Sequence, residues 1–374
     1  MKKLYKGNEA IAEAAVAAGC KCYFGYPITP QNEIPEFMSW RLPEVGGHCV
    51  QAESEVGAIN MVYGAAGAGA RTMTSTSSPG MSLKCEGFSY LANAEVPCVI
   101  VNIVRCGPGL GGILPSQGDY MQAVKGGGHG DYHMFVYAPS TVQEAADLTY
   151  KAFDIAEKYR CPVVILSDGS LGQMMEPVEM PDFGKPKQAD ISWAASGNNG
   201  GKKRVISSMY VDPLLFERHI HKMFAKYERM AAEDTMAEEY KCGDAELILT
   251  AYGISARVCK AAVDILRQNG VKAGLIRPIT LFPFPAAVFE KYAAKASVKQ
   301  FLCCELSMGQ MLEDVKLSIG GKKPVDFYGR CGGVIMTAEE VVEYVRDGKK
   351  PANLIECQKF FDAVKNAPVK KAKK

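Results

Sequence analysis

Residues 98–104 read CVIVNIV, and this run is the clearest indication of the fold class in the sequence. Residues 161–166, which read CPVVIL, have the same character. Both runs are apolar at nearly every position and rich in β-branched side chains, which is typical of strands buried on both faces of a sheet. Because such a sheet must be covered by helices on each face, the two runs predict an α/β domain.

The segments around these runs have the patterns of helices and further strands. Residues 142–160 predict a helix between the two strands, with Ser140 and Gln143 in a capping-box arrangement at its start. A second capping box, Thr337 with Glu340, predicts the start of the last helix. Upstream, we expect a helix over 8–19, a strand over 21–26 and a helix over 54–66. This alternation indicates a doubly wound fold.

Changes in composition divide the chain into four parts. Residues 1–184 hold the first α/β domain, and residues 185–243 are rich in glycine, asparagine and charged side chains, so we expect a connecting arm with little core there. A second α/β domain is expected over residues 244–360, followed by a basic, solvated tail over 361–374. Its strands are expected near residues 246–251, 271–276, 300–304 and 325–328.

The overall composition excludes several classes of protein. With 48% hydrophobic and 22% charged residues the chain can bury a large core, and 43 basic against 41 acidic side chains leave a net charge of only +2. This balance argues against a nucleic-acid-binding protein, which normally has a basic excess. No apolar stretch has the length of a membrane span, and the N-terminal residues lack the apolar region of a secretory signal. We therefore expect a cytoplasmic protein.

The thirteen cysteines do not form a metal-binding or cluster-binding pattern. Cys-x-x-Cys is absent, and the close pairs Cys20/Cys22 and Cys303/Cys304 match neither an iron–sulfur cluster nor a structural zinc site. We expect most of them to be buried thiols. If the protein takes part in redox chemistry, the electron carrier should lie on another chain.

Two glycine-rich segments suggest loops beside a site. Residues 107–112, GPGLGG, formally match a dinucleotide fingerprint, but residues 114–116, Leu-Pro-Ser, follow where a Rossmann turn would open a helix. Residues 126–131 lack the Lys-Ser/Thr ending of a P-loop. A nicotinamide-dependent dehydrogenase is thus a weaker alternative, and both segments are interpreted as the rim of an active site at strand ends.

A more specific signal comes from motifs in a fixed order. Residues 26–30 read YPITP at the end of the first predicted strand, residues 51–58 read QAESEVGA at the start of a helix, and Arg105 ends the strand over 98–104. With residues 277–285, RPITLFPFP, this order resembles the alpha subunit of the 2-oxoacid:ferredoxin oxidoreductases, which are thiamine diphosphate enzymes of anaerobic metabolism. The likeness covers nearly the whole chain. It implies a pyrimidine-binding-type domain followed by a transketolase C-terminal-like domain.

The resemblance assigns a cofactor role to Glu55. Thiamine diphosphate becomes a nucleophile when its C2 proton is lost to its own 4′-imino group, and that tautomer needs a carboxyl group hydrogen-bonded to ring atom N1′. Glu55 matches the family's position for this carboxyl group, whereas Glu53 is the neighbouring competitor. Either residue could instead be a helix-start carboxylate favoured by the helix dipole. By the same likeness, Pro27 and Ile28 are expected to contact the aminopyrimidine ring.

Arg105 and Thr29 are the candidate substrate-binding residues. An exposed guanidinium at the strand end could bind the substrate carboxylate with two parallel hydrogen bonds. Thr29, held between Pro27 and Pro30, could donate its hydroxyl to the substrate carboxylate or carbonyl oxygen. The catalytic set implied by the resemblance is therefore Glu55, Arg105 and Thr29.

The second half of a thiamine diphosphate site is absent from the sequence. Such enzymes bind the diphosphate through a metal ion at a Gly-Asp-Gly motif, which does not occur here. The resemblance therefore implies a thiamine diphosphate-binding beta subunit, a gamma subunit and a ferredoxin-like cluster subunit as partners. Mg²⁺ and the iron–sulfur clusters would be bound by these subunits and no metal by this chain, and ferredoxin and coenzyme A would be further reaction partners.

The loop after Arg105 bears on the substrate. Residues 105–117 resemble the branched-chain, 2-oxoisovalerate members of the family more than the 2-oxoglutarate members. A second substrate carboxylate needs a second cation, but this loop carries Leu110, Ile113 and Leu114 and no charge before Asp119. We expect oxidative decarboxylation of 2-oxoisovalerate to the acyl-coenzyme A with reduction of ferredoxin. A 2-oxoglutarate enzyme is the alternative, and a non-catalytic scaffold subunit is a hypothesis of another class.

Overall fold

Two long parallel strands, β5 (Cys98–Val104) and β7 (Pro162–Asp168), form the centre of a seven-stranded sheet in this computed structural model. The structure describes residues 2–180, 186, 190–197, 201 and 203–366. Every residue of both strands is buried, which confirms the expected sheet covered on both faces. The order is β12-β6-β7-β5-β4-β2-β3, and only β12 runs antiparallel to its neighbour. The other strands are β2 (Cys22–Gly25), β3 (His48–Gln51), β4 (Thr72–Thr76), β6 (Phe135–Tyr137) and β12 (Thr280–Phe282).

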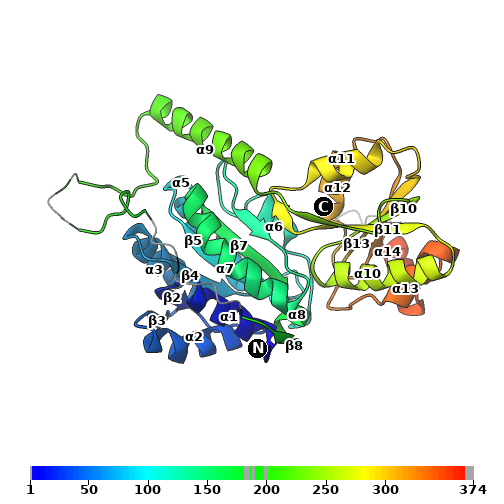
Figure 1. Ribbon diagram of the computed structural model, residues 1–374, viewed down its shortest axis with the longest axis horizontal. Helices are drawn as coiled ribbons and strands as arrows, with labels where there is room; N and C mark the ends of the chain where they lie inside the picture. Colours follow the sequence, from blue (N-terminus) through cyan, green and yellow to red (C-terminus); the bar gives the residue numbers. More distant parts are fainter. Residues whose placement is uncertain (1, 181–185, 187–189, 198–200, 202, 367–374) are drawn as a thin grey trace, which may run out of the picture.

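Helices cover both faces of this sheet (Figure 1). They are α1 (Gly7–Ala17), α2 (Glu33–Glu44), α3 (Glu55–Gly67), α4 (Ser78–Leu83), α5 (Cys85–Asn93), α6 (Tyr120–Val124), α7 (Val142–Tyr159) and α8 (Gly169–Gln173). Val99 and Val101 of β5 pack in one core with residues of α1, α2 and α7. Ile100 and Val104 pack in the opposite core with residues of α3, α5 and α6. Successive side chains of β5 thus point into two different cores, which is why nearly every residue of the strand is apolar.

The second lobe contains a five-stranded sheet in the order β14-β13-β10-β11-β9. Its strands are β9 (Ala237–Tyr240), β10 (Leu247–Thr250), β11 (Ala273–Pro278), β13 (Gln300–Glu305) and β14 (Val325–Gly329), and its helices are α10 (Gly253–Gln268), α11 (Ala286–Ala293), α12 (Met311–Ile319), α13 (Ala338–Asp347) and α14 (Ala352–Lys365). A two-stranded antiparallel sheet of β1 (Lys3–Lys6) and β8 (Met175–Val178) lies apart from both. Both lobes are α/β, as the sequence predicts.

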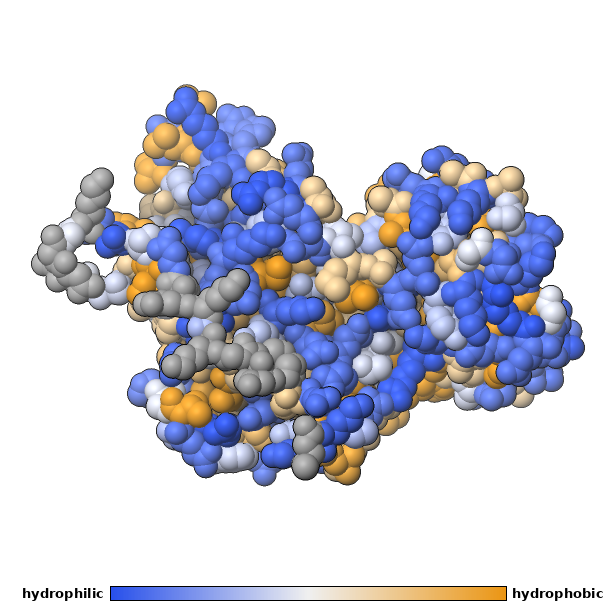
Figure 2. All heavy atoms as spheres, in the orientation of Figure 1, coloured by the Kyte–Doolittle hydropathy of each residue, from blue (hydrophilic) through white to orange (hydrophobic). Residues whose placement is uncertain are grey.

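The segment expected to be a connecting arm contains more structure than its composition indicates. It holds α9 (Pro213–Glu233), which begins at Asp212, whose side chain accepts from the backbone N–H groups of Leu214 and Leu215. Met223, Tyr227 and Met230 of α9 are buried against the first lobe. The expectation of little core is therefore wrong for this helix, because its apolar residues recur on one face between charged ones. Orange atoms gather near the outer end of α9 (Figure 2), where Leu214 is exposed.

Two predicted helix starts have different outcomes. Thr337 accepts a hydrogen bond from the Glu340 backbone N–H and caps α13, as predicted. At α7 the cap is Thr141, not Ser140, because the Thr141 hydroxyl accepts from the Glu144 N–H. The expectation that Thr337 begins the last helix is wrong, because α14 follows α13. Helix α14 has no buried residue and includes residues 361–365, which were expected to belong to the tail; most of the tail lies outside the described residues. Among the residues that the structure describes, no helix is long and apolar enough to cross a membrane.

Hydrogen bonds tie the two lobes together beside the loop that follows β5. The amide of Gln117 donates through Nε2 to the Tyr252 carbonyl at 2.8 Å. Its Oε1 accepts from the Ser255 hydroxyl at 2.7 Å and from the Leu306 N–H at 2.9 Å. Gln117 is 3% exposed, so these bonds form in the interior and fix the loop against the second lobe.

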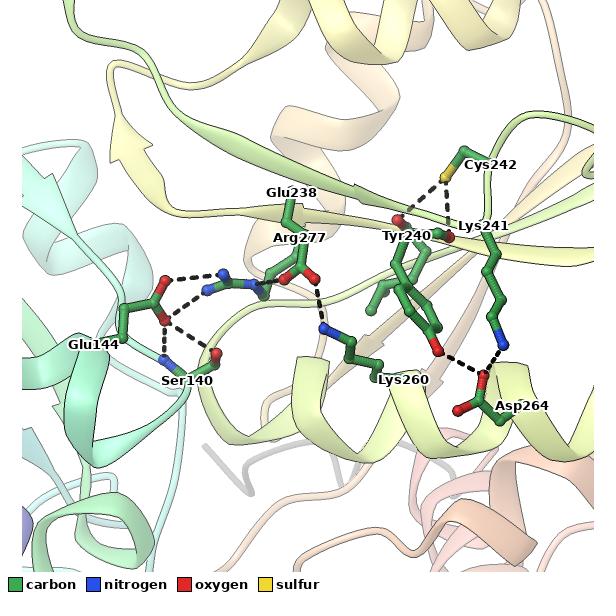
Figure 3. Close-up of polar contacts among 10 residues, drawn as sticks. Ser140, Glu144, Glu238, Tyr240, Lys241, Cys242, Lys260, Asp264 and Arg277 are labelled. Atoms are coloured by element: carbon green, nitrogen blue, oxygen red, sulfur yellow. Dashed lines mark hydrogen bonds and ion pairs between the residues drawn. The ribbon is translucent and has the colours of Figure 1, made fainter. Parts of the chain in front are cut away.

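A second interlobe contact centres on Arg277 (Figure 3). Its two terminal nitrogens donate to the two oxygens of Glu144 on α7, at 2.9 Å each. Its Nε donates to Glu238 on β9 at 2.9 Å, and Glu238 also pairs with Lys260 on α10. This pairing connects the RPITLFPFP motif to helices of both lobes.

Candidate active site

The predicted site residues gather at one edge of the seven-stranded sheet. Strands β2, β4, β5 and β7 are parallel, so their carboxyl ends meet at this edge. The turn over residues 26–30 follows β2, the start of α4 follows β4, and Arg105 follows β5. Ligands of open α/β sheets bind at this edge.

Glu55 is buried at the first position of α3. The Ser54 hydroxyl caps the helix by accepting from the Gly57 N–H at 3.1 Å. Glu55 is 5% exposed, and a Cβ built at Gly80 would lie 2.5 Å from its Oε1. The lack of a side chain at Gly80 therefore makes room for the carboxyl group. Glu53 is exposed, so the structure distinguishes the two carboxylates by burial.

The surroundings of Glu55 fit a bound nitrogen heterocycle. Among the described residues no group of the chain donates a hydrogen bond to its carboxyl oxygens. The hydroxyls of Thr76 and Ser77, at the adjacent end of β4, are buried without a partner. Buried hydroxyls without a partner are costly, and a group that binds at the Glu55 carboxyl could complete their hydrogen bonds. The aminopyrimidine ring of thiamine diphosphate carries groups of this kind.

Thr29 and Arg105 lie in contact. The Arg105 Nη1 donates to the Thr29 carbonyl at 3.0 Å, and Nη2 donates to the Leu110 carbonyl at 3.0 Å. Our expectation of an exposed guanidinium is wrong, because Arg105 is only 7% exposed. The loop over residues 107–112 folds back over it and supplies one of its acceptors. The Nε of Arg105 is buried without a partner, while Thr29 itself is exposed.

The turn that carries Pro27 and Ile28 borders a cleft of about 380 Å³ between α2 and β3. Pro27 lines this cleft together with Tyr23 and Gln51. Below the turn, the buried side chain of Gln31 donates to the Tyr26 carbonyl at 3.3 Å and accepts from Ser75 on β4. The turn is thus attached to the strand whose end carries the unpaired hydroxyls.

Sequence reasoning missed a polar cluster beside Arg105. The Ser78 hydroxyl lies 3.0 Å from the Arg105 backbone nitrogen, from which it accepts, and it donates to Asp119 at 2.7 Å. Asp119 also accepts from Asn102 at 2.9 Å. Burial raises the pKa of the Asp119 carboxyl group, although the hydrogen bonds from Ser78 and Asn102 act in the opposite direction. Asn102 interrupts the apolar run CVIVNIV, and this interruption was the available signal.

Lys84 was also missed. It is entirely buried, and its Nζ donates to the Thr74 hydroxyl at 2.8 Å and to the Ser75 carbonyl at 3.1 Å. Burial lowers the pKa of Lys84 to about 7, and the nearby Glu55 carboxylate opposes this decrease. A single cation between apolar and small residues, in the sequence GMSLKCEGF, could have indicated it.

The loop that bears on substrate choice contacts the second lobe. Leu110, Ile113 and Leu114 are 82%, 61% and 55% exposed. A Cβ built at Gly333 would lie 2.4 Å from the Cβ of Leu114, so Leu114 rests on a glycine of the second lobe. No helix opens within residues 107–119, which are all described, and this agrees with the weak dinucleotide fingerprint.

The described cysteines are all free thiols. Among the described residues no group of three His, Cys, Asp or Glu side chains could hold a metal ion. The residues that fit a cofactor are therefore those that would contact its ring, around Glu55.

Comparisons with known proteins identify the family of this chain. The family described as pyruvate flavodoxin/ferredoxin oxidoreductase, thiamine diphosphate-binding, matches residues 13–238. The family described as pyruvate:ferredoxin oxidoreductase core domain II matches residues 245–341.

The curated relatives include oxidoreductase subunits. The ketoisovalerate oxidoreductase subunit VorB of Methanothermobacter thermautotrophicus is 48% identical over 92% of this chain and 97% of its own length. The 2-oxoglutarate synthase subunit KorA of Methanocaldococcus jannaschii is 35% identical over 90% of this chain and 97% of its own length.

Solved structures have the same fold. The 2-oxoglutarate:ferredoxin oxidoreductase from Magnetococcus marinus superimposes with a TM-score of 0.85 at 28% identity, over 92% of this chain and 65% of that longer chain. A split-gene transketolase, an inactive tetramer, superimposes with a TM-score of 0.54 at 14% identity over 91% of this chain and 97% of that chain, a likeness of fold alone. The two-lobed α/β fold and the matches over nearly the whole chain lead to one conclusion: the chain is an enzyme subunit of the thiamine diphosphate-binding 2-oxoacid:ferredoxin oxidoreductase family.

Proposed function

We propose that this chain supplies the aminopyrimidine half of a thiamine diphosphate site in a multi-subunit 2-oxoisovalerate:ferredoxin oxidoreductase. The observation that carries the proposal is the buried carboxyl group of Glu55, which is without a partner among the described residues and lies beside unpaired hydroxyls. Thiamine diphosphate, when bound, supplies the nucleophile and the electron sink for decarboxylation of a 2-oxoacid. Glu55 would hold the proton shared with ring atom N1′.

Pro27 and Ile28 would contact the ring through the turn after β2. The turn is fixed through Gln31 and Ser75, so it offers a rigid surface rather than one that must order on binding. Because a ring held between this turn and Glu55 has one orientation, the chain would set the direction in which the reacting carbon faces the substrate.

Arg105 and Thr29 would bind the substrate carboxylate. Arginine has five N–H donors, and the carbonyls of Thr29 and Leu110 occupy only two at Arg105. Three N–H groups remain for a carboxylate, and one of them, on the buried Nε, has no partner within the described chain. The exposed hydroxyl of Thr29 lies on the same turn as the carbonyl that Arg105 already contacts. A substrate carboxylate would thus accept hydrogen bonds from donors that Arg105 and Thr29 already hold close together.

The substrate assignment rests on the loop over residues 107–114 and on relatives. The apolar side chains Leu110, Ile113 and Leu114 suit an aliphatic substrate, and the relative with 48% identity is a ketoisovalerate oxidoreductase subunit. The relative at 35% identity, a 2-oxoglutarate synthase subunit, keeps 2-oxoglutarate as the second candidate. Apolar pockets discriminate weakly, so we expect activity with several branched 2-oxoacids.

The remaining parts of the reaction would lie on other chains of a cytoplasmic complex. We propose a diphosphate- and Mg²⁺-binding beta subunit, a gamma subunit and a ferredoxin-like subunit with iron–sulfur clusters. Electrons would pass to ferredoxin and the acyl group to coenzyme A. This division accords with the absence of a Gly-Asp-Gly motif and of Cys-x-x-Cys spacing.

The test is coenzyme A-dependent reduction of a viologen dye by the complex formed with the partner subunits, with 2-oxoisovalerate, 2-oxoglutarate and pyruvate compared. We expect the highest kcat/KM for 2-oxoisovalerate. A preference for 2-oxoglutarate would overturn the substrate assignment, but the proposed reaction class would stand. Absence of activity with all three, in a complex that contains thiamine diphosphate and intact clusters, would favour a scaffold subunit.

Glu55→Gln and Glu53→Gln form a matched pair for the carboxyl group. Both variants remove one negative charge near the start of α3, but only Glu55 is buried. We expect Glu55→Gln to lower turnover by about 100-fold or more, the range for loss of a proton-transfer group. Glu53→Gln should leave it within about two-fold, since exposed charges contribute little. Equal effects of the two variants would contradict the assignment of Glu55.

A further inference from the structure

Lys84 is a buried cation with no carboxylate among its hydrogen-bond partners. It links α4 to α5, and its Nζ donates to the Thr74 hydroxyl and the Ser75 carbonyl of β4. Both acceptors are uncharged. A buried ammonium costs free energy unless another charge compensates it, so a purely structural capping role would be served better by a neutral donor.

The compensating charge is the Glu55 carboxylate. Glu55 comes from α3 and Lys84 from the junction of α4 and α5, and both meet the end of β4. A Cβ built at Gly80 would lie 2.2 Å from the Thr76 hydroxyl and 2.5 Å from the Glu55 Oε1, which places the carboxyl group against this strand end. The Glu55 carboxylate opposes the decrease that burial causes in the pKa of Lys84. A protonated Lys84 and an ionised Glu55 together carry no net charge.

We infer that Lys84 is a positioning residue for Glu55. Its ammonium balances the Glu55 carboxylate from the protein interior, so that the carboxyl group stays in place and faces outward for the cofactor ring. The inference rests on the proposed function of Glu55 and adds a second residue to it. Lys84 touches neither the cofactor nor the substrate in this arrangement, since it is fully buried.

The charge of Lys84 gives the inference a measurable signature. Because the pKa of Lys84 lies at about 7, the ammonium loses its proton within the range in which the complex can be assayed. The affinity for thiamine diphosphate should then change between pH 6 and pH 8 through proton linkage to Lys84, beyond the change that titration of the ligand itself causes in every variant. A structural lysine far from the site would not produce such a transition.

The test uses the assembled complex and measures thiamine diphosphate binding by calorimetry at pH 6, 7 and 8 without 2-oxoacid. Lys84→Met removes the charge at similar side-chain length. Lys226→Met is the matched control, because the Lys226 side chain is also only 10% exposed and pairs with Glu95 on the other side of the lobe. We expect Lys84→Met to bind about ten-fold more weakly at pH 6 and to have a smaller pH dependence than the unmodified complex, whereas Lys226→Met behaves as the unmodified complex.

Lys84→Arg keeps the measurement decisive if the methionine variant does not assemble. A guanidinium stays charged throughout this range, so the variant should bind at pH 6 as the unmodified complex does and show no transition near pH 7. If Lys84→Met binds thiamine diphosphate with unchanged affinity and unchanged pH dependence, the inference is overturned. If only Lys84→Arg assembles, an unchanged transition near pH 7 in that variant overturns it. Glu55→Gln, measured by calorimetry and by the viologen assay, separates the two proposals. If it binds thiamine diphosphate and turns over normally, the proposed role of Glu55 fails; if it alone is impaired, only the role of Lys84 fails.

Discussion

Replacement of Arg277 by methionine should loosen the contact between the two lobes. Arg277 is 6% exposed and makes three charge-assisted hydrogen bonds, two to Glu144 and one to Glu238, each at 2.9 Å. Methionine has nearly the length of the arginine stem but no donor. Two carboxylates would then lose their shared cation at a site largely closed to water.

The free energy cost of Arg277→Met depends on the hydrogen bonds and solvent contact that Glu144 and Glu238 retain. Removal of one partner from a buried ion pair costs about 3 to 5 kcal/mol. Here the Glu144 side chain is 21% exposed and still accepts from the Ser140 N–H and hydroxyl, and the Glu238 side chain is 30% exposed and still pairs with Lys260. We therefore expect the lower limit, about 3 kcal/mol, which is roughly a 150-fold increase in the open fraction.

Hydrogen exchange measured by mass spectrometry can localise the effect. Faster exchange should be confined to the peptides of β11 and β12 and the first turn of α7, because local opening shows in the elements that lose the contact. The double variant Arg277→Met/Glu144→Gln should be less destabilised than the sum of the single variants, which isolates the pairwise energy. A change below about 1 kcal/mol in Arg277→Met, or additive single effects, would refute this reasoning.

Three further predictions concern the site. The pKa of Lys84 is about 7 in the folded state and about 10.5 in the unfolded state, so the unfolded chain binds more protons between these values. The free energy of unfolding of the unmodified protein should therefore rise by about 2 to 3 kcal/mol from pH 7 to pH 9 relative to Lys84→Met, which lacks this group. Urea unfolding at the two pH values measures the difference. Gly333→Ala should change the kcat/KM ratio of 2-oxoisovalerate to pyruvate by about ten-fold because its Cβ would displace Leu114. Gly332→Ala, which also has a positive φ but open space around the new Cβ, should not change it. Arg105→Lys should lower kcat/KM by about 10- to 100-fold through loss of a charge-assisted hydrogen bond, and an unchanged value in steady-state kinetics would exclude Arg105 from substrate binding.

The sequence predicted the features that depend on neighbouring residues. The apolar runs of β5 and β7 have a local cause, burial on both faces, so their pattern sufficed to place the sheet. Thr337 could likewise be identified as a helix cap, because capping needs only the next three residues. Thr141 at α7 shows the limit of that reasoning, since two adjacent hydroxyl residues both precede the helix and spacing alone does not choose between them.

Features that depend on distant residues were not predictable. The burial of Arg105 comes from a loop that folds back over it, and the burial of Lys84 from its reach to β4, and neither leaves a periodic pattern in the sequence. The choice of Glu55 over Glu53 came from family resemblance, and the burial of Glu55 beside Gly80 adds a physical reason for it. The core contributed by α9 has a local pattern, apolar residues on one face, but the many charges between them hid it from an argument based on composition.

The position of β12 constrains how the protein can be made and divided. Strand β12 lies in the second half of the chain, yet it completes the sheet of the first lobe by pairing with β6, about 140 residues earlier. During synthesis the first lobe therefore carries an open sheet edge at β6 until the ribosome has passed Phe282. A fragment that ends at the apparent boundary near residue 243 would keep that edge and be prone to self-association. Any expression of the first lobe on its own should extend through β12.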